Sequence, residues 1–183
     1  MAHYETDQYN LIRSGKQWFG ERFDSNTPSR SFNFNFPQLD QSKEIYITVS
    51  AAARSSSDSR FDITLNNELL NSISINSVGL NSEEGMFANE NSITQQLKAT
   101  QNNLTVGLKF GSSFANALGW LDFININVHS RLTMTGSQCS FRSSETINAQ
   151  TAVTFQLENA NENTIVWDVT APSSPERIVG ELS

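Results

Sequence analysis

The stretch from Glu44 to Ala51, which reads EIYITVSA, decides the fold class. Apolar residues alternate along it with polar residues and one tyrosine. Such a two-residue period places successive side chains on opposite faces of an extended chain, which is typical of a strand with one buried face. The residues predicted to face the core are Ile45, Ile47, Val49 and Ala51. The stretch therefore predicts a β-strand in a sheet that covers a hydrophobic core.

The same alternation recurs along most of the chain. It appears at residues 31–36, 61–65, 73–75, 104–110, 124–128, 153–157 and 165–169. Asn66-Asn67 suits a hairpin turn, and residues 93–99 fit a helix or a strand equally well. Roughly ten short strands separated by turn-rich segments are typical of a sandwich or barrel. We predict an all-β fold, an antiparallel β-sandwich of the jelly-roll or galactose-binding-like type.

The sandwich is expected to span residues 1–170. Pro172 and Pro175 bracket two serines after it, as in a linker, so residues 171–183 are expected to lead to a following domain that this sequence does not contain. Met1 to Asn10 is polar and lacks the apolar core of a signal peptide. The chain is therefore expected to be either cytosolic or an internal piece of an exported protein whose signal peptide lies upstream.

The net charge of the chain limits the classes of partner that it is expected to bind. The chain carries 12 Lys and Arg against 19 Asp and Glu, for a net charge of −7. Nucleic-acid binders gain most of their affinity from basic residues that neutralise phosphates, and no basic run is present. We therefore expect no nucleic-acid partner and no attraction to an anionic membrane surface.

Nucleophilic catalysis finds little support in the sequence. Cys139 is the only cysteine, and alternation places it on one face with Phe141, which predicts a small buried side chain rather than a reactive thiolate. A serine triad is disfavoured because no Gly-x-Ser-x-Gly elbow is present. Of the two histidines, His3 is expected in a frayed terminus and His129 on a polar strand face.

Metal chemistry has no motif either. Asp58, Asp62, Glu83 and Glu84 are candidates for a structural calcium ion in a loop, but a solvated polar loop is the favoured interpretation. No other cofactor is expected. Asp122 and Asp168, each within an apolar strand, are interpreted as structural carboxylates.

The segment Gly15 to Asp24 is the most unusual part of the chain. Two glycines flank Trp18 and Phe19, and acidic and basic residues follow. The aromatic pair serves either as an anchor for a partner or as a plug at one end of the sandwich, with Glu21 and Arg22 paired locally. The physics favours the plug.

Three stretches resemble the region that precedes the catalytic domain in PorU-type sortases, the gingipain-like cysteine peptidases of the bacterial type IX secretion system. They are residues 14–24, residues 119–127 with their continuation to Arg142, and Val166 to Pro172, in the same order as in the family. The resemblance implies that the catalytic His and Cys lie in a separate downstream domain, and that the chain is part of a protein exported to the bacterial cell surface or outer membrane. No catalytic residue carries over to this chain.

The resemblance implies a non-catalytic accessory domain that supports or orients the downstream catalytic domain of the same polypeptide, or binds another type IX secretion component. The alternative is a carbohydrate-binding sandwich whose ligand is a surface glycan such as lipopolysaccharide. The residues expected to contact a partner or ligand are Trp18, Phe19, Glu21, Tyr46, Trp167 and Asp168. Trp167 and Asp168 are expected to face a following domain, although alternation suits a core position for Trp167 equally well.

Overall fold

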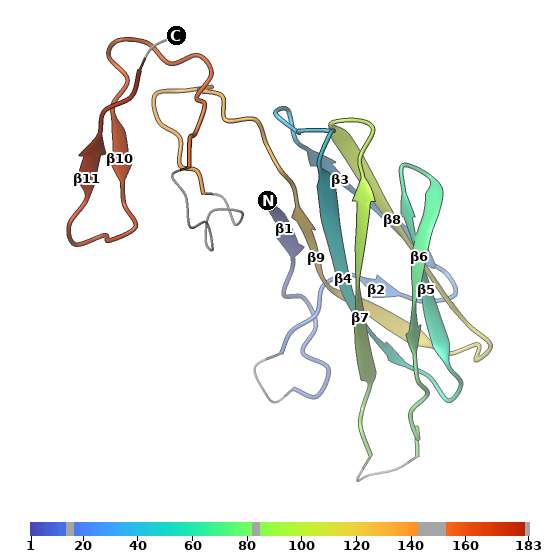
Figure 1. The fold of residues 1–183 in the computed structure, drawn as a ribbon. Helices are drawn as coiled ribbons and strands as arrows, with labels where there is room; N and C mark the ends of the chain where they lie inside the picture. Colours follow the sequence, from blue (N-terminus) through green and yellow to red (C-terminus); the bar gives the residue numbers. More distant parts are fainter. Residues whose placement is uncertain (14–16, 82–84, 143–152, 182–183) are drawn as a thin grey trace. The chain divides into compact units, whose positions relative to one another are not determined.

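A computed structural model describes residues 1–13, 17–81, 85–142 and 153–181. The chain forms two compact units, Met1–Ser130 and Arg131–Ser183. The predicted all-β architecture is confirmed, and the described residues of the first unit form nine strands (Figure 1). They are β1 (Ala2–Glu5), β2 (Arg22–Phe23), β3 (Ser29–Asn35), β4 (Glu44–Arg54), β5 (Ser59–Leu65), β6 (Glu68–Ile75), β7 (Asn89–Lys98), β8 (Asn103–Ser112) and β9 (Leu118–Asn127).

Two antiparallel sheets form the sandwich. One has the order β1-β9-β4-β7, with β2 also paired to β9, and the other has the order β3-β8-β5-β6. If the short β2 is set aside, eight strands remain. The first, eighth, third and sixth of them form one sheet, and the second, seventh, fourth and fifth form the other. This is the order of a jelly roll, so the predicted fold class is confirmed.

The core lies between the two sheets and follows the predicted alternation. In β4 the side chains of Ile45, Ile47, Val49 and Ala51 are 0–1% exposed. From the opposite sheet, the Phe61 ring meets Phe23 edge-on at 5.2 Å between centroids. The expected hairpin turn is also present. Asn66 and Asn67 both have positive φ, 52° and 72°, which is the conformation that a two-residue hairpin turn requires.

Side-chain amides join the two sheets along one side. The neighbouring edges are β6 and β7, and residues 93–98 form part of strand β7 rather than a helix. Asn89 and Asn91 of β7 donate to backbone carbonyl groups at residues 74, 76 and 77. The amide of Asn71 in β6 donates to Gln95 at 2.8 Å. These bonds partner polar groups that would otherwise lie unpaired at a closed edge.

The second unit has a different character. Its strands are β10 (Val166–Asp168) and β11 (Glu176–Ile178), which pair with each other as a two-stranded sheet. The strand predicted at residues 153–157 is wrong, because these residues form no strand and most of their side chains are exposed. The strand predicted at 165–169 exists over three residues, but in the described part of the chain it pairs only with β11 and joins neither sheet of the sandwich. Within residues 1–13, 17–81, 85–142 and 153–181, no helix is long and apolar enough to cross a membrane.

Candidate functional site

The segment between β1 and β2 covers part of the outer face of the five-stranded sheet. Phe19 exchanges backbone hydrogen bonds with Tyr9, at 2.9 Å and 2.8 Å. Its ring is buried in a small cluster with Ala52 and Trp120, on the face of β4 and β9 that points away from the core. The plug interpretation is therefore wrong in its location. Phe19 packs on the outer face of the five-stranded sheet, where the small side chain of Ala52 leaves room for its ring. It does not close an end of the sandwich.

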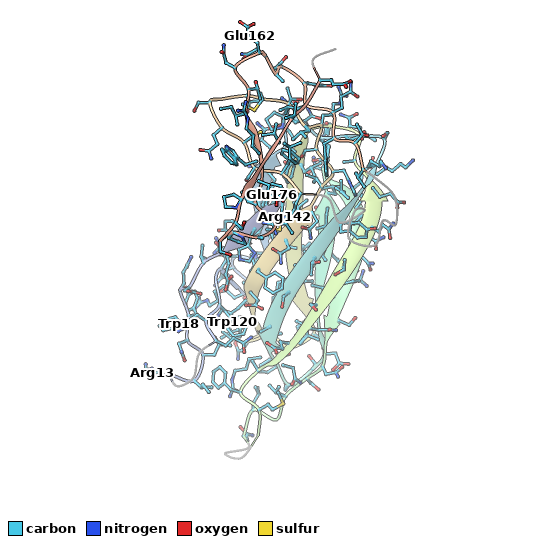
Figure 2. All side chains as sticks on the ribbon, turned by 60° about the vertical axis from the view of Figure 1, so that its left-hand side comes forward. Arg13, Trp18, Trp120, Arg142, Glu162 and Glu176 are labelled. Carbon is cyan, nitrogen blue, oxygen red and sulfur yellow. The ribbon has the colours of Figure 1, made fainter. Side chains whose placement is uncertain are left out.

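Trp18 is a surface residue. Its side chain is 42% exposed, and it lies on the same side of the sandwich as Trp120 (Figure 2). Beside it, the Gln17 amide donates to Glu90 at 2.6 Å. The two aromatic residues of this segment therefore separate into a buried Phe19 and an accessible Trp18. Gly15, which precedes them, lies outside the described residues.

Glu21 is buried, with only 9% of its surface exposed. One carboxylate oxygen accepts hydrogen bonds from the hydroxyls of Tyr4 and Thr6, while the other has no partner among the described residues. Burial, followed by the bond to Glu21, raises the pKa of Tyr4. The predicted local pairing of Glu21 with Arg22 is wrong. Arg22 points to the opposite side of its strand and pairs with Asp24 at 2.8 Å.

Tyr46 lies on a polar surface formed by β4, β7 and β9, which we call the outer sheet face. Its side chain is 39% exposed. The register places it between Gln96 and Asn127, with Thr48 and Thr94 hydrogen-bonded to each other at 2.8 Å in the next row. The outer sheet face consists of Tyr46, Thr48, Thr94, Gln96, Asn125 and Asn127. It presents hydroxyl and amide groups beside one aromatic ring.

His3 borders the outer sheet face. Its ring nitrogens lie 2.6 Å from Asn125 Oδ1 and 2.7 Å from Glu5 Oε2. The hydrogen bond to Asn125, followed by that to Glu5, raises the pKa of His3. The predicted frayed terminus is wrong, because β1 pairs with β9. In the described part of the chain, neither His3 nor His129 shares a hydrogen bond with a serine or cysteine side chain.

Asp122 sits at an irregularity in the pairing of β4 with β9. The register shifts between Ser50 and Ala51, so that Asp122 has no partner opposite it. Ser50 donates to its carboxylate at 2.9 Å. Burial is the largest cause of a raised pKa for Asp122, and the nearby charges of Glu5 and Glu90 add to it.

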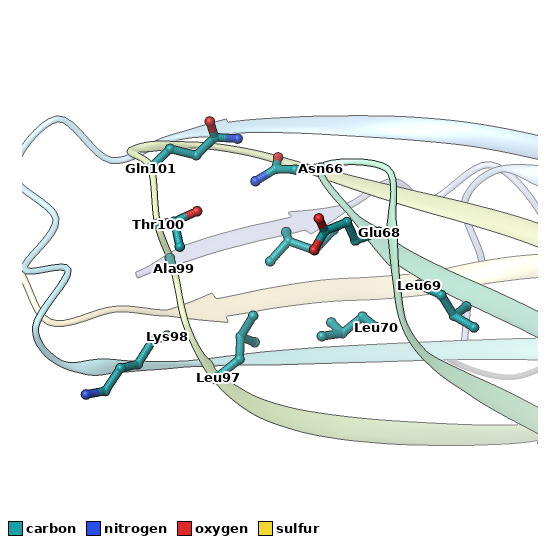
Figure 3. Close-up of a pocket in the computed structure, with 10 residues that line it drawn as sticks. Asn66, Glu68, Leu69, Leu70, Leu97, Lys98, Ala99, Thr100 and Gln101 are labelled. Carbon is teal, nitrogen blue, oxygen red and sulfur yellow. The ribbon is translucent and has the colours of Figure 1, made fainter.

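A pocket of about 330 Å³ opens where β6 and β7 diverge (Figure 3). It lies next to the hydrogen bond between Asn71 and Gln95, which is the last of the side-chain amide bonds between these two edges. Four leucines are among its lining residues, together with the charged Glu68 and Lys98. It contains none of the residues predicted to contact a ligand.

In the second unit, Trp167 is 55% exposed. Asp168 is exposed too, and its carboxylate accepts a hydrogen bond from the Thr170 amide at 2.8 Å. The predicted burial of Cys139 and Phe141 is wrong. The Cys139 thiol is exposed, and Phe141 is 40% exposed beside the Phe155 ring. Alternation misleads here because residues 139–141 form no strand.

The calcium candidates do not gather in the described structure. The Asp58 carboxylate accepts from the Ser77 amide, and Asp62 pairs with Arg60. Glu83 and Glu84 lie outside the described residues. Among residues 1–13, 17–81, 85–142 and 153–181, no three acidic, histidine or cysteine side chains form a group that could hold a metal ion.

The six predicted contact residues fall in different places. Phe19 and Glu21 are buried, Trp18 and Tyr46 lie on the outer side of the five-stranded sheet, and Trp167 and Asp168 belong to the second unit. Sequence reasoning missed the polar neighbours of Tyr46, since the pairing of β4 with β7 and β9 is a long-range property. The only sign of this polar face in the sequence is the alternation of polar Thr48 with apolar Val49.

Comparisons with known proteins add to the description of the fold. No protein-family model matches the chain, and no curated protein matches its sequence. The crystal structure of dimeric latent PorU from Porphyromonas gingivalis is similar over 74% of this chain and 13% of that protein, with 20% sequence identity and a TM-score of 0.59.

Two carbohydrate-binding modules resemble the chain less closely. The CBM36 module solved with calcium and xylotriose has 14% identity over 69% of this chain and all of its own, with a TM-score of 0.42. The CBM36-1 domain of a multidomain xylanase from the hindgut metagenome of Trinervitermes trinervoides has 14% identity over 63% of this chain and 90% of its own, with a TM-score of 0.44. The comparison with PorU shows that the sandwich shares its fold with one small part of that protein.

Proposed function

We propose that this chain is a non-catalytic accessory domain of an exported bacterial cell-surface protein akin to the type IX secretion sortases. In this proposal it docks on a protein partner through its second unit. The partner is the catalytic domain of the same polypeptide or another secretion component. The resemblance of three sequence stretches to PorU-type proteins and the fold shared with part of PorU support this assignment.

The exposure of apolar side chains in the second unit carries the proposal. In residues 131–142 and 153–181, no side chain is buried. The large apolar side chains at its surface are Phe141, Val153, Phe155, Ile165, Trp167, Val169, Ile178 and Val179, which are 40–90% exposed. Soluble proteins rarely leave so many apolar groups uncovered, and such surfaces mark contacts with proteins or membranes. The acidic net charge of the chain disfavours an anionic membrane.

The test compares two exposed tryptophans in the full-length protein that carries this chain. Trp167→Ala is expected to reduce partner co-purification and the processing of secreted cargo. Trp18→Ala is the matched control, since Trp18 is also exposed but lies in the sandwich. Normal processing and assembly after deletion of residues 1–170 would refute an accessory role. A normal result with Trp167→Ala alone would exclude docking through β10.

A second candidate function is glycan binding at the outer sheet face. The observation that favours it is the exposed Tyr46 ring between the Gln96 and Asn127 amides, since aromatic rings stack on sugars and amides bond to hydroxyls. The test is a binding screen against lipopolysaccharide and a glycan panel. Tyr46→Ala should abolish any signal, while Tyr9→Ala at another exposed tyrosine should not. The absence of signal above background would exclude this function.

A further inference from the structure

The sheet of β10 and β11 is small and incomplete. Val166, Trp167 and Asp168 pair with Ile178, Arg177 and Glu176, respectively. A two-stranded sheet is at best marginally stable in water, and a third strand or a packed face is usually needed. This hairpin has no buried side chain. Its structure therefore leaves room for an additional strand.

One edge of this sheet suits strand addition better than the other. In the described part of the chain, β10 has backbone hydrogen bonds only with β11, so its second edge is open. Residues 165–169 contain no proline, so every residue whose backbone groups point away from β11 keeps both its donor and its acceptor. Pro175 stands directly before β11 and lacks the N–H group that a ladder requires. The open edge of β10 is therefore the longer template.

The two faces of β10 differ in chemistry. Ile165, Trp167 and Val169 lie on one face and are 55%, 55% and 63% exposed, with Arg177 of β11 directly opposite Trp167. On the other face Asp168 stands directly across from Glu176, beside the apolar pair of Val166 and Ile178. Like charges in this arrangement destabilise a sheet. Neither carboxylate forms an ion pair with a described residue, so the pair is open to an incoming cation.

We infer that an extended strand of the protein partner adds to the open edge of β10. The strand presents apolar side chains beside Trp167 and a lysine or arginine beside Asp168, one strand away from Glu176. This inference rests on the proposed docking function and specifies its mode. Main-chain hydrogen bonds would give affinity, and alternate side chains would give specificity, as in other cases of strand addition. The basic residue would relieve the repulsion between the two carboxylates.

The test uses the whole chain and two synthetic octapeptides of alternating valine and threonine. One carries lysine at its fourth position, and the other carries glutamate there. Hydrogen exchange is followed at residues 160–181 during titration at low salt. The lysine peptide is expected to protect residues 165–169 and to bind about three- to tenfold more tightly than the glutamate peptide. The double variant Asp168→Asn, Glu176→Gln should lose this preference while it keeps strand addition.

Equal binding of both peptides to the unaltered chain, or protection that spares residues 165–169, would overturn the inference. Strong protection of these residues before any peptide is added would also overturn it, because the edge would already be covered. The outcome is separate from that of the docking function. Trp167→Ala tests docking in the full-length protein, and the peptides test strand addition whatever that protein binds.

Discussion

A methyl group on Gly119 would lie 2.7 Å from Cζ of Phe61. Gly119 of β9 pairs with Ala53 of β4. The Phe110 ring is nearly as close to the position of the added methyl group, at 2.8 Å. The two phenylalanines come from the opposite sheet and stand 4.9 Å apart between ring centroids. The missing side chain at Gly119 therefore allows aromatic rings to fill the space between the sheets.

Gly119→Ala is expected to destabilise the sandwich by about 1–3 kcal/mol, because both rings must shift in a packed core. Chemical denaturation monitored by circular dichroism measures the change. Gly111→Ala on β8 is the control, since a methyl group there would have no atom within 4 Å. Equal stability of the two variants would contradict the role assigned to Gly119.

Tyr4→Phe is expected to cost about 1–3 kcal/mol, because it removes the best donor to the buried Glu21 carboxylate. The ring of Tyr4 packs 4.8 Å from that of Phe32, and phenylalanine keeps this contact. Thermal unfolding measures the loss. Tyr46→Phe, which removes an exposed hydroxyl, should leave the midpoint unchanged, and an equal loss there would speak against a specific role of Tyr4.

Asp122→Asn is expected to stabilise the protein at pH 7. The raised pKa means that the folded state disfavours the charged carboxylate relative to the unfolded chain. The contribution of Asp122 to the stability of the natural protein therefore decreases as pH rises from 3.8, the ordinary pKa of the group, through its native pKa. Asparagine can still accept the hydrogen bond from Ser50. We expect a modest rise in melting temperature, under about 4 °C.

The dependence on pH is the diagnostic part of this result. The gain in stability from Asp122→Asn should shrink as the pH falls below the native pKa of Asp122. At such pH the natural carboxyl group is protonated and is therefore as uncharged as asparagine. Melting curves between pH 3 and pH 8 follow it. An advantage that is constant over this range would show that burial of the charge is not its cause.

Calcium is expected to leave stability unchanged, because Asp58 and Asp62 already have protein partners. Melting temperatures with a chelator and with millimolar calcium are the measurement. A rise with calcium would point to a site that includes Glu83 or Glu84. Variants in which each is replaced by glutamine would then locate it.

The sandwich was predictable from the sequence because most of its strands turn one apolar face toward the core. Residues 45–49 alternate so regularly that local pattern and tertiary burial agree. The same logic fails at Cys139 and at residues 153–157, where apolar side chains alternate without a sheet to cover. Alternation indicates which side chains a strand would bury, but it does not indicate whether a second sheet is present to cover them.

The candidate sites were less predictable. Glu21 is bound by Tyr4 and Thr6, from a segment 15–17 residues earlier in the chain, and no local pattern announces a buried carboxylate. The surroundings of Tyr46 depend on strand pairings across 50 and 81 residues. The exposure of Trp167 also contradicts the core position that alternation allows, because among the described residues β10 pairs with β11 and with no other strand.

The amide bonds between β6 and β7 affect the behaviour of the protein at high concentration. Unpaired strand edges are templates for aggregation. The asparagines of β7 occupy backbone carbonyl groups at residues 74, 76 and 77, so these groups are withheld from pairing with another molecule. Replacement of Asn89 and Asn91 would create a route to fibrils or disordered oligomers even if the sandwich still folded. The abundant asparagine of this chain thus contributes to its colloidal stability as well as to its fold.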